Sequence, residues 1–219
     1  MRTRFGGLVA ALALAAFSFA SPARAAQFIY QFVMDGPSES PANASPATGL
    51  GFAVYDDVTQ DFTMSATFSG LIGNVSQTHF HGATTNSGLS PLAIPTPAQR
   101  QAAASAALTA SIMVGNTSLP GFPLGVQSGV YANTINLNTA GIYNVGYLNT
   151  THLGNVTNAR NAFVAGLAAG KVYWNIHTTG TGGFPGGEIR GFADLIPEPA
   201  TGGLAAIGLA ALAARRRRK

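Results

Sequence analysis

The sequence predicts a mainly β protein, an antiparallel β-sandwich or barrel, from three observations. Glycine and proline are abundant, with 27 and 12 residues, and charged residues make up only 9% of the chain, against about 25% in an average soluble domain. Apolar and polar residues alternate in short runs, as they do along half-buried strands. Turn-forming residues interrupt these runs about every 8–12 residues, a spacing typical of sandwiches and barrels.

Six segments carry the strand signal. They are Phe28–Val33, Gly49–Tyr55, Asp61–Phe68, Val75–His81, Lys171–Thr178 and Gly187–Leu195. Each is rich in β-branched or aromatic residues or alternates with a period of two. In the second segment, Leu50, Phe52 and Val54 share one face.

The segment 83–156 is a central insertion with a different composition. Thr96-Pro97-Ala98-Gln99 is a capping-box signature, so the alanine-rich run to about Ala110 is predicted to be helical. A second short helix is predicted over Asn158–Ala169, with Gly170 suited to the position after its end. Two apolar pieces are candidates for further strands: Tyr131–Leu137 and Ile142–Leu148.

The first 25 residues have the pattern of a secretory signal peptide. Arg2 and Arg4 precede the uncharged apolar run Gly6–Ala20, and Ala23 and Ala25 supply the small residues of a cleavage site. The alternative, a short transmembrane anchor, is disfavoured because the run is short. The sequence therefore predicts export, with cleavage by signal peptidase after Ala25.

The C-terminal tail also has an ordered pattern. It consists of Pro197-Glu198-Pro199, the uncharged run Ala200–Ala214, and a basic end of Arg215, Arg216, Arg217, Arg218 and Lys219. A helix over the middle part would be roughly 22 Å long. That is shorter than a bilayer core of about 30 Å, so the helix is a marginal membrane span.

This tail resembles a PEP-CTERM sorting signal. The resemblance implies transient insertion in the inner membrane of a Gram-negative bacterium that makes extracellular polysaccharide. It also implies recognition by an exosortase and removal of the tail near Pro197, Glu198 and Pro199. An ordinary tail anchor is the alternative.

The formal net charge of +4 comes from the two ends. Between Ala26 and Ile196 the chain has four basic and seven acidic residues, a net charge of −3. A nucleic-acid partner is therefore not expected, although a basic chain would otherwise suggest one. The chain has no cysteine, which excludes disulfides, thiolate metal sites and cysteine nucleophiles.

Three blocks between the ends resemble a chordin-type (CHRD) domain. They are Gly36-Pro37-Ser38-Glu39-Ser40-Pro41, Thr78-His79-Phe80-His81-Gly82, and Gly170–Thr178 with Phe184–Gly191. The resemblance covers about Phe28–Leu195, with a single Pro41 where two prolines are common and a longer central segment. It implies an extracellular immunoglobulin-like or superoxide-dismutase-like β-sandwich without established catalytic activity. The expected organisation is a signal peptide (1–25), a CHRD-like domain (26–195) and a sorting tail (196–219).

Three histidines are candidate metal ligands. Alternation places His79 and His81 on one face of a strand. In another strand it places His177 opposite Trp174 and Ile176, which are expected to face the core. If the two strands are neighbours, the imidazoles can hold Cu or Zn with water at an open position.

The alternative for these histidines is a polar layer in which they hydrogen-bond to backbone and to Tyr173, Asn175 and Glu188. His152, in a loop rich in Asn and Thr, is expected to be a bystander.

Glu188 and Arg190 are predicted to share a face of the last strand. Glu39 is a plausible acceptor for Arg190, since a carboxylate can pin a loop to a guanidinium group. A structural pair is favoured over a contact with a ligand.

The favoured function is an exported, exosortase-sorted envelope or matrix protein with a non-catalytic CHRD domain. Its expected partners are signal peptidase, exosortase, and a polysaccharide or an envelope protein. The alternative is a Cu- or Zn-binding extracellular module or metalloenzyme that uses the three histidines. A dinuclear copper–zinc site would need more histidines and an aspartate. No G-x-S-x-G or P-loop pattern indicates a hydrolase or a nucleotide site.

Overall fold

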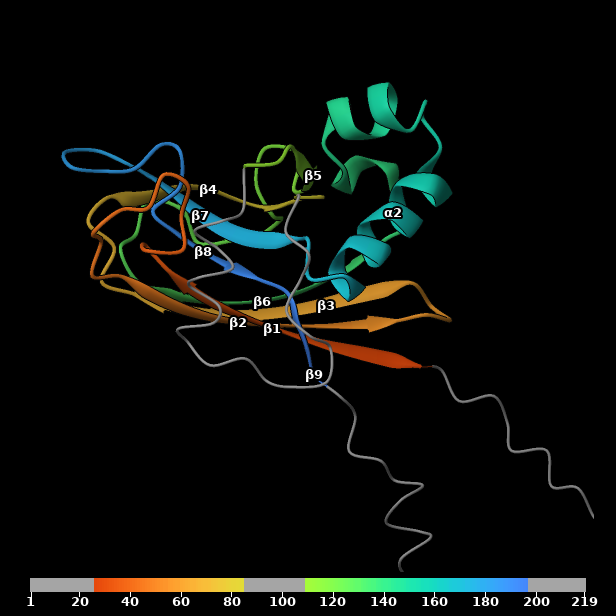
Figure 1. The fold of residues 1–219 in the computed structure, drawn as a ribbon, viewed down its shortest axis with the longest axis horizontal. Helices are drawn as coiled ribbons and strands as arrows, with labels where there is room; N and C mark the ends of the chain where they lie inside the picture. The colour runs from red at the N-terminus through yellow and green to blue at the C-terminus, as the bar shows by residue number, and fades with distance from the viewer. Residues whose placement is uncertain (1–25, 85–108, 197–219) are drawn as a thin grey trace, which may run out of the picture.

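The computed structural model describes residues 26–84 and 109–196 (Figure 1). The strands are β1 (Gln27–Asp35), β2 (Thr48–Asp56), β3 (Asp61–Ser69), β4 (Asn74–His81), β5 (Ile112–Val114), β6 (Gly129–Asn136), β7 (Tyr173–Thr179), β8 (Ile189–Phe192) and β9 (Asp194–Ile196). The helical elements are a 3₁₀ turn (η1, Ala140–Ile142), a π-helix (η2, Gly146–Thr151) and an α-helix (α2, Val156–Ala168). Two predicted segments lie outside the described residues: the signal peptide and the sorting tail from residue 197. The helix predicted from Thr96 also lies outside them, apart from its last two positions, which are not helical.

The strands form one antiparallel sheet in the order β5-β4-β7-β8-β1-β2-β3-β6, with β9 also paired to β1. The mainly β, antiparallel architecture predicted from the sequence is confirmed. The sheet curls, so that β4 and β7 lie over β1, β2, β3 and β6 (Figure 1).

A sandwich of two separate sheets is not confirmed, because β8 connects the two layers. On one side β8 pairs with β7 over four residue pairs. On the other side Arg190 pairs with Asp35 of β1. The ladder is therefore continuous around the core, and the two layers are parts of a single curled sheet.

The space between the layers is filled by an aromatic cluster. The ring of Phe80 lies 5.5 Å from both Phe32 and Phe62, 5.8 Å from Phe163 and 4.8 Å from Trp174. All five side chains are fully buried. They come from β1, β3, β4, α2 and β7, so burial of these rings stabilises the contact between the two layers and the helix.

The inner face of β2 consists of the small residues Gly49, Gly51 and Ala53, followed by the buried Tyr55. A Cβ atom on Gly51 would lie 2.9 Å from ring atoms of Trp174. Leu50, Phe52 and Val54 therefore face outward, and Leu50 is 38% exposed. The alternation of Leu50, Phe52 and Val54 correctly indicated a shared face, but this face lies outside the core because the tryptophan needs the space above the glycine.

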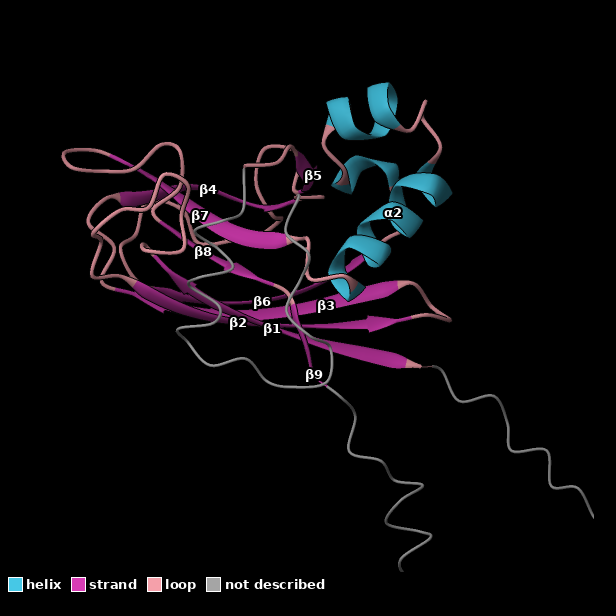
Figure 2. Ribbon diagram, viewed as in Figure 1, coloured by secondary structure: helices cyan, strands magenta, loops and turns pink. Residues whose placement is uncertain are grey.

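The helical elements lie beside one end of the sheet (Figure 2). Helix α2 begins where the Asn155 side chain accepts a hydrogen bond from the backbone of Asn158, and it buries Phe163 and Leu167. Gly170 has a φ of 64° just after the helix, as the sequence predicted. No helix in the described part of the chain is long and apolar enough to cross a membrane.

The two apolar pieces of the central insertion differ in structure. Tyr131–Leu137 corresponds to β6, whereas Ile142–Leu148 contains the end of η1 and the start of η2. A strand there is wrong because the Asn144 side chain accepts hydrogen bonds from the backbone of Gly146 and Tyr147, which starts a helical turn.

Candidate metal centre

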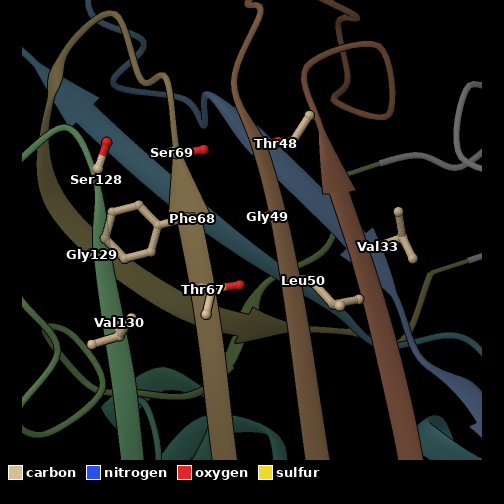
Figure 3. Close-up of a pocket in the computed structure, with 10 residues that line it drawn as sticks. All are labelled: Val33, Thr48, Gly49, Leu50, Thr67, Phe68, Ser69, Ser128, Gly129 and Val130. Atoms are coloured by element: carbon tan, nitrogen blue, oxygen red, sulfur yellow. The ribbon is translucent and has the colours of Figure 1, made fainter.

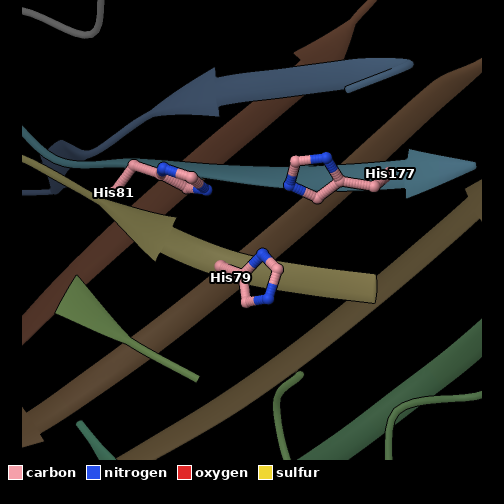
Figure 4. A group of neighbouring side chains, drawn as sticks. All are labelled: His79, His81 and His177. Carbon is pink, nitrogen blue, oxygen red and sulfur yellow. The ribbon is translucent and has the colours of Figure 1, made fainter. Parts of the chain in front are cut away.

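Strands β4 and β7 are neighbours, and this pairing brings the three histidines together. In the ladder Gln77 pairs with His177, His79 with Asn175, and His81 with Tyr173. All three imidazoles lie on the side of these strands opposite the aromatic core, two from β4 and one from β7 (Figure 4). This side is partly covered, since His79 is 1% and His81 8% exposed, whereas His177 is half-buried.

The rings point toward one another. Ring centroids are 5.1 Å apart for His79 and His177, 5.6 Å for His79 and His81, and 5.8 Å for His81 and His177. One ring nitrogen from each histidine lies within 4.8 Å of the other two. The ring nitrogens that remain available to a ligand are Nδ1 of His79, Nε2 of His81 and Nε2 of His177. Each is buried without a hydrogen-bond partner in the described part of the chain.

The other nitrogen of each ring is held by a backbone carbonyl. Nε2 of His79 donates to Thr117 O at 2.9 Å, and Nδ1 of His81 donates to Ala110 O at 2.9 Å. Nδ1 of His177 donates to Pro185 O at 2.8 Å. Because a carbonyl only accepts, each of these nitrogens carries the proton and each inward nitrogen carries a lone pair. Each histidine therefore offers one unprotonated nitrogen in a cluster whose ligand-capable atoms lie within 4.8 Å of one another. Metal-binding histidines commonly donate their other ring nitrogen to a carbonyl in this way.

The electrostatics keep the rings neutral. Burial, and to a lesser degree the charge of His177, lower the pKa of His79 from 6.5 to about 4. Burial and neighbouring charges lower the pKa of His81 from 6.5 to about 4, and burial lowers that of His177. These imidazoles therefore stay unprotonated at their inward nitrogens near neutral pH. A metal ion binds imidazole in this unprotonated state.

Tyr173 fixes the orientation of His81. The two rings are stacked, with centroids 4.9 Å apart and an interplanar angle of 5°. The Tyr173 hydroxyl also accepts a 3.3 Å hydrogen bond from the backbone N–H of Ala110, the residue whose carbonyl holds His81. The His81 ring is therefore held on one face and at one edge by the same pair of residues.

Comparison with protein families identifies the domain that carries these histidines. The family model of the CHRD domain matches residues 30–193. The chain belongs to the CHRD domain family. The PEP-CTERM protein-sorting motif matches residues 195–218, directly after that domain, and implies export, transit through the membrane and processing by an exosortase. Neither the curated proteins nor the solved structures contain a match.

A second polar group of the CHRD domain lies next to the histidines. Arg190 of β8 is fully buried, with its guanidinium carbon 4.7 Å from the centre of the Tyr173 ring. Its Nε lies 3.7 Å from a Glu39 carboxylate oxygen and also donates to Ser38 O. A Cβ on Gly187 would lie 2.5 Å from Glu39 Oε1, so glycine is required there for the carboxylate to approach.

Burial dominates the charge state of Glu39. It raises the pKa of this carboxyl group from 4.5 to about 7, although the Arg190 charge acts in the opposite direction. The geometry is that of an internal tie between the loop after β1 and strand β8.

Glu188 is held by donors other than Arg190. Its carboxylate accepts from Ser45 Oγ at 2.6 Å, Thr178 Oγ1 at 2.7 Å, and the backbone N–H groups of Ile72 at 2.6 Å and Gly73 at 3.2 Å. Burial raises the pKa of this carboxyl group, but these four hydrogen bonds outweigh burial and lower it. Glu188 thus joins three segments at the opposite end of β8 from Phe192, as a structural anchor.

A groove of the CHRD domain lies on the outer face of β1, β2, β3 and β6 (Figure 3). Its lining is Val33, Thr48, Gly49, Leu50, Thr67, Phe68, Ser69, Ser128, Gly129 and Val130. None of these side chains titrates or binds metals strongly, so the groove has no groups for acid–base or metal chemistry.

The sequence did not indicate which groups hold the histidines in place. The carbonyls of Thr117, Ala110 and Pro185 come from loops, and any residue type can supply a backbone carbonyl. His152 lies away from the triad, with its ring 4.6 Å from that of Tyr147.

Proposed function

We propose that this protein is an exported, exosortase-sorted envelope protein whose CHRD domain is a non-catalytic module that binds one transition-metal ion. The ligands are Nδ1 of His79, Nε2 of His81 and Nε2 of His177. The PEP-CTERM motif supports the export and sorting, and the geometry of the three rings supports the metal function.

The single observation that carries the metal proposal is the convergence of three buried lone pairs. A buried acceptor without a donor costs about 1–3 kcal/mol. Three such acceptors within 4.8 Å of one another add mutual repulsion to this cost. A bound cation removes both penalties, because each lone pair then forms a coordinate bond.

A purely structural role for the histidines explains this arrangement less well. In a polar layer, each ring would use both nitrogens in hydrogen bonds, as buried polar groups generally do. Here all three rings use one nitrogen and leave the other facing the same space. Imidazole ligands favour Cu, Zn or Ni, whereas Ca²⁺ and Mg²⁺ prefer oxygen.

Isothermal titration of the exported protein with Zn(II), with Cu(II) and, under anaerobic conditions, with Cu(I) tests the proposal. The expected result is one ion per chain, lost in the variant His79→Ala plus His81→Ala. His152→Ala is the matched control, because this histidine lies outside the triad, and it should bind as the unmodified protein does. Unchanged binding in the double variant, or no binding at all, would contradict the proposal.

The sorting part is tested separately by mass spectrometry of the protein recovered from the cell surface. The expected mature protein lacks the segment Arg215–Lys219, because the tail is removed near Glu198. A mature protein that still ends in this basic segment would contradict exosortase processing without affecting the metal site.

A further inference from the structure

The coordination sphere offered by the CHRD domain has only three donors. The group of metal-competent side chains contains the three histidines and, among the described residues, no carboxylate and no fourth nitrogen donor. The inward nitrogens are also shielded from solvent. An ion at this point is therefore surrounded by three neutral ligands whose inward nitrogens are buried, although the His177 side chain as a whole is half-buried.

The number of ligands in this coordination sphere suits some metal ions better than others. Zn²⁺ in proteins is almost always four-coordinate, with either four side chains or three side chains and a water. The three imidazoles do not themselves supply the fourth ligand. Zn²⁺ and monovalent copper both have a filled d shell that imposes no geometry, but monovalent copper differs in being stable with three nitrogen ligands in a plane.

The charge of the ion also favours a monovalent metal over a divalent one. Burial of an ion costs free energy that rises with the square of its charge, unless a counter-charge is buried with it. The three ligands are neutral, and the neighbouring Glu39 carboxyl group is already paired with Arg190 at 3.7 Å. The free-energy cost of desolvation is therefore smaller for a monovalent ion than for a divalent one.

The walls of the site also restrict the geometry. The Tyr173 ring stacks on His81, and backbone carbonyls hold the outer nitrogen of all three rings. The rings are thus hindered from turning to make room for a square-planar arrangement, which Cu(II) prefers.

We infer that the ion held by His79, His81 and His177 is copper in its monovalent state, bound by three nitrogens without a fourth protein ligand. This inference rests on the proposed metal function and identifies the ion that the site binds. The CHRD domain then acts as an extracellular holder of Cu(I), and oxidation of the bound ion is disfavoured because Cu(II) lacks its preferred ligands.

The test is an anaerobic titration of the exported protein with Cu(I) in the presence of a chromogenic Cu(I) chelator, with parallel titrations of Zn(II) and Cu(II). The expected result is one Cu(I) per chain, bound more tightly than Zn(II). His177→Ala should weaken Cu(I) binding by more than the about 10–100-fold typical of the loss of an outer-shell partner. His152→Ala should leave it unchanged.

X-ray absorption at the copper edge of the unmodified protein gives a second readout that does not depend on variants that fold poorly. Three nitrogen scatterers at about 2.0 Å are expected, a length typical of imidazole–metal bonds. Tighter binding of Zn(II), or four or more scatterers around copper, would overturn the Cu(I) inference and leave the metal function intact. Failure of every metal to bind would overturn both.

Discussion

The imidazole ring of His81 lies parallel to the phenol ring of Tyr173, with centroids 4.9 Å apart and an angle of 5° between the planes. The two residues are also directly paired in the ladder between β4 and β7. Tyr173 in turn lies under the guanidinium group of Arg190. Side chains from three adjacent strands thus form one stack that ends at a candidate metal ligand.

This stack predicts that Tyr173 positions His81 for metal binding. Tyr173→Leu removes the flat face and should weaken metal affinity about 10–100-fold, the range for outer-shell partners. Tyr173→Phe keeps the ring and loses only the hydroxyl that accepts from Ala110. It should stay within a few-fold of the unmodified protein. Titration calorimetry measures both, and equal affinities for the two variants would contradict the role of the ring face.

The stability of the metal-free protein should depend on pH through His79 and His81. Both pKa values are lowered from 6.5 to about 4 in the folded state. Between these values the unfolded chain binds protons that the folded chain does not. The free energy of unfolding therefore decreases as the pH falls through this window, and the full contribution is present above pH 6.5.

Glu39 acts in the opposite direction, since its pKa is raised from 4.5 to about 7. The effect of two histidines is larger than that of one carboxyl group. The free energy of unfolding therefore still decreases as the pH falls. Urea unfolding at a series of pH values measures this slope, and His79→Gln plus His81→Gln should flatten it. Stability that rises toward acid in the unmodified protein would contradict the lowered pKa values.

Arg190 should be among the residues most important for stability. Arg190→Ala leaves Glu39 without its partner in a buried site and should reduce the free energy of unfolding by about 3–5 kcal/mol. Arg160→Ala is the matched control, because the side chain of this half-buried arginine donates to Asn138 and Asn161 in the described part of the chain. It should cost at most about 1 kcal/mol. Equal losses in chemical unfolding would show that the buried tie contributes no more than a surface contact.

Gly51 should not tolerate a side chain. Gly51→Ala places a Cβ 2.9 Å from the ring of Trp174 and should cost about 1–3 kcal/mol through overpacking. The chain has one tryptophan, so its fluorescence reports the displacement directly. Gly141→Ala, where a Cβ meets nothing within 4 Å, is the control and should leave stability and fluorescence unchanged.

Much of the fold could be predicted from the sequence because its signals are local. Alternation located the long strands, and the core face of β7, with Trp174 and Ile176, is fully buried. The glycine after α2 was also found from its position alone. The outward direction of Leu50 was not predictable, because it depends on Trp174, which is 124 positions away in the chain but packs against Gly51.

The candidate site was partly predictable for the same reason. Alternation gave the shared face of His79 and His81, but the approach of His177 required the pairing of β4 with β7. The loop carbonyls that set the protonated nitrogen of each ring leave no trace in the sequence. These carbonyls are the basis on which we propose a metal ion rather than a simple polar layer.

Anomalous X-ray scattering from a crystal of the exported protein grown with copper tests the metal-binding claim most directly. We predict a single strong copper peak about 2 Å from Nδ1 of His79, Nε2 of His81 and Nε2 of His177. A copper-soaked crystal with no peak between these three nitrogens, or with a water molecule bonded to them instead, would contradict the account.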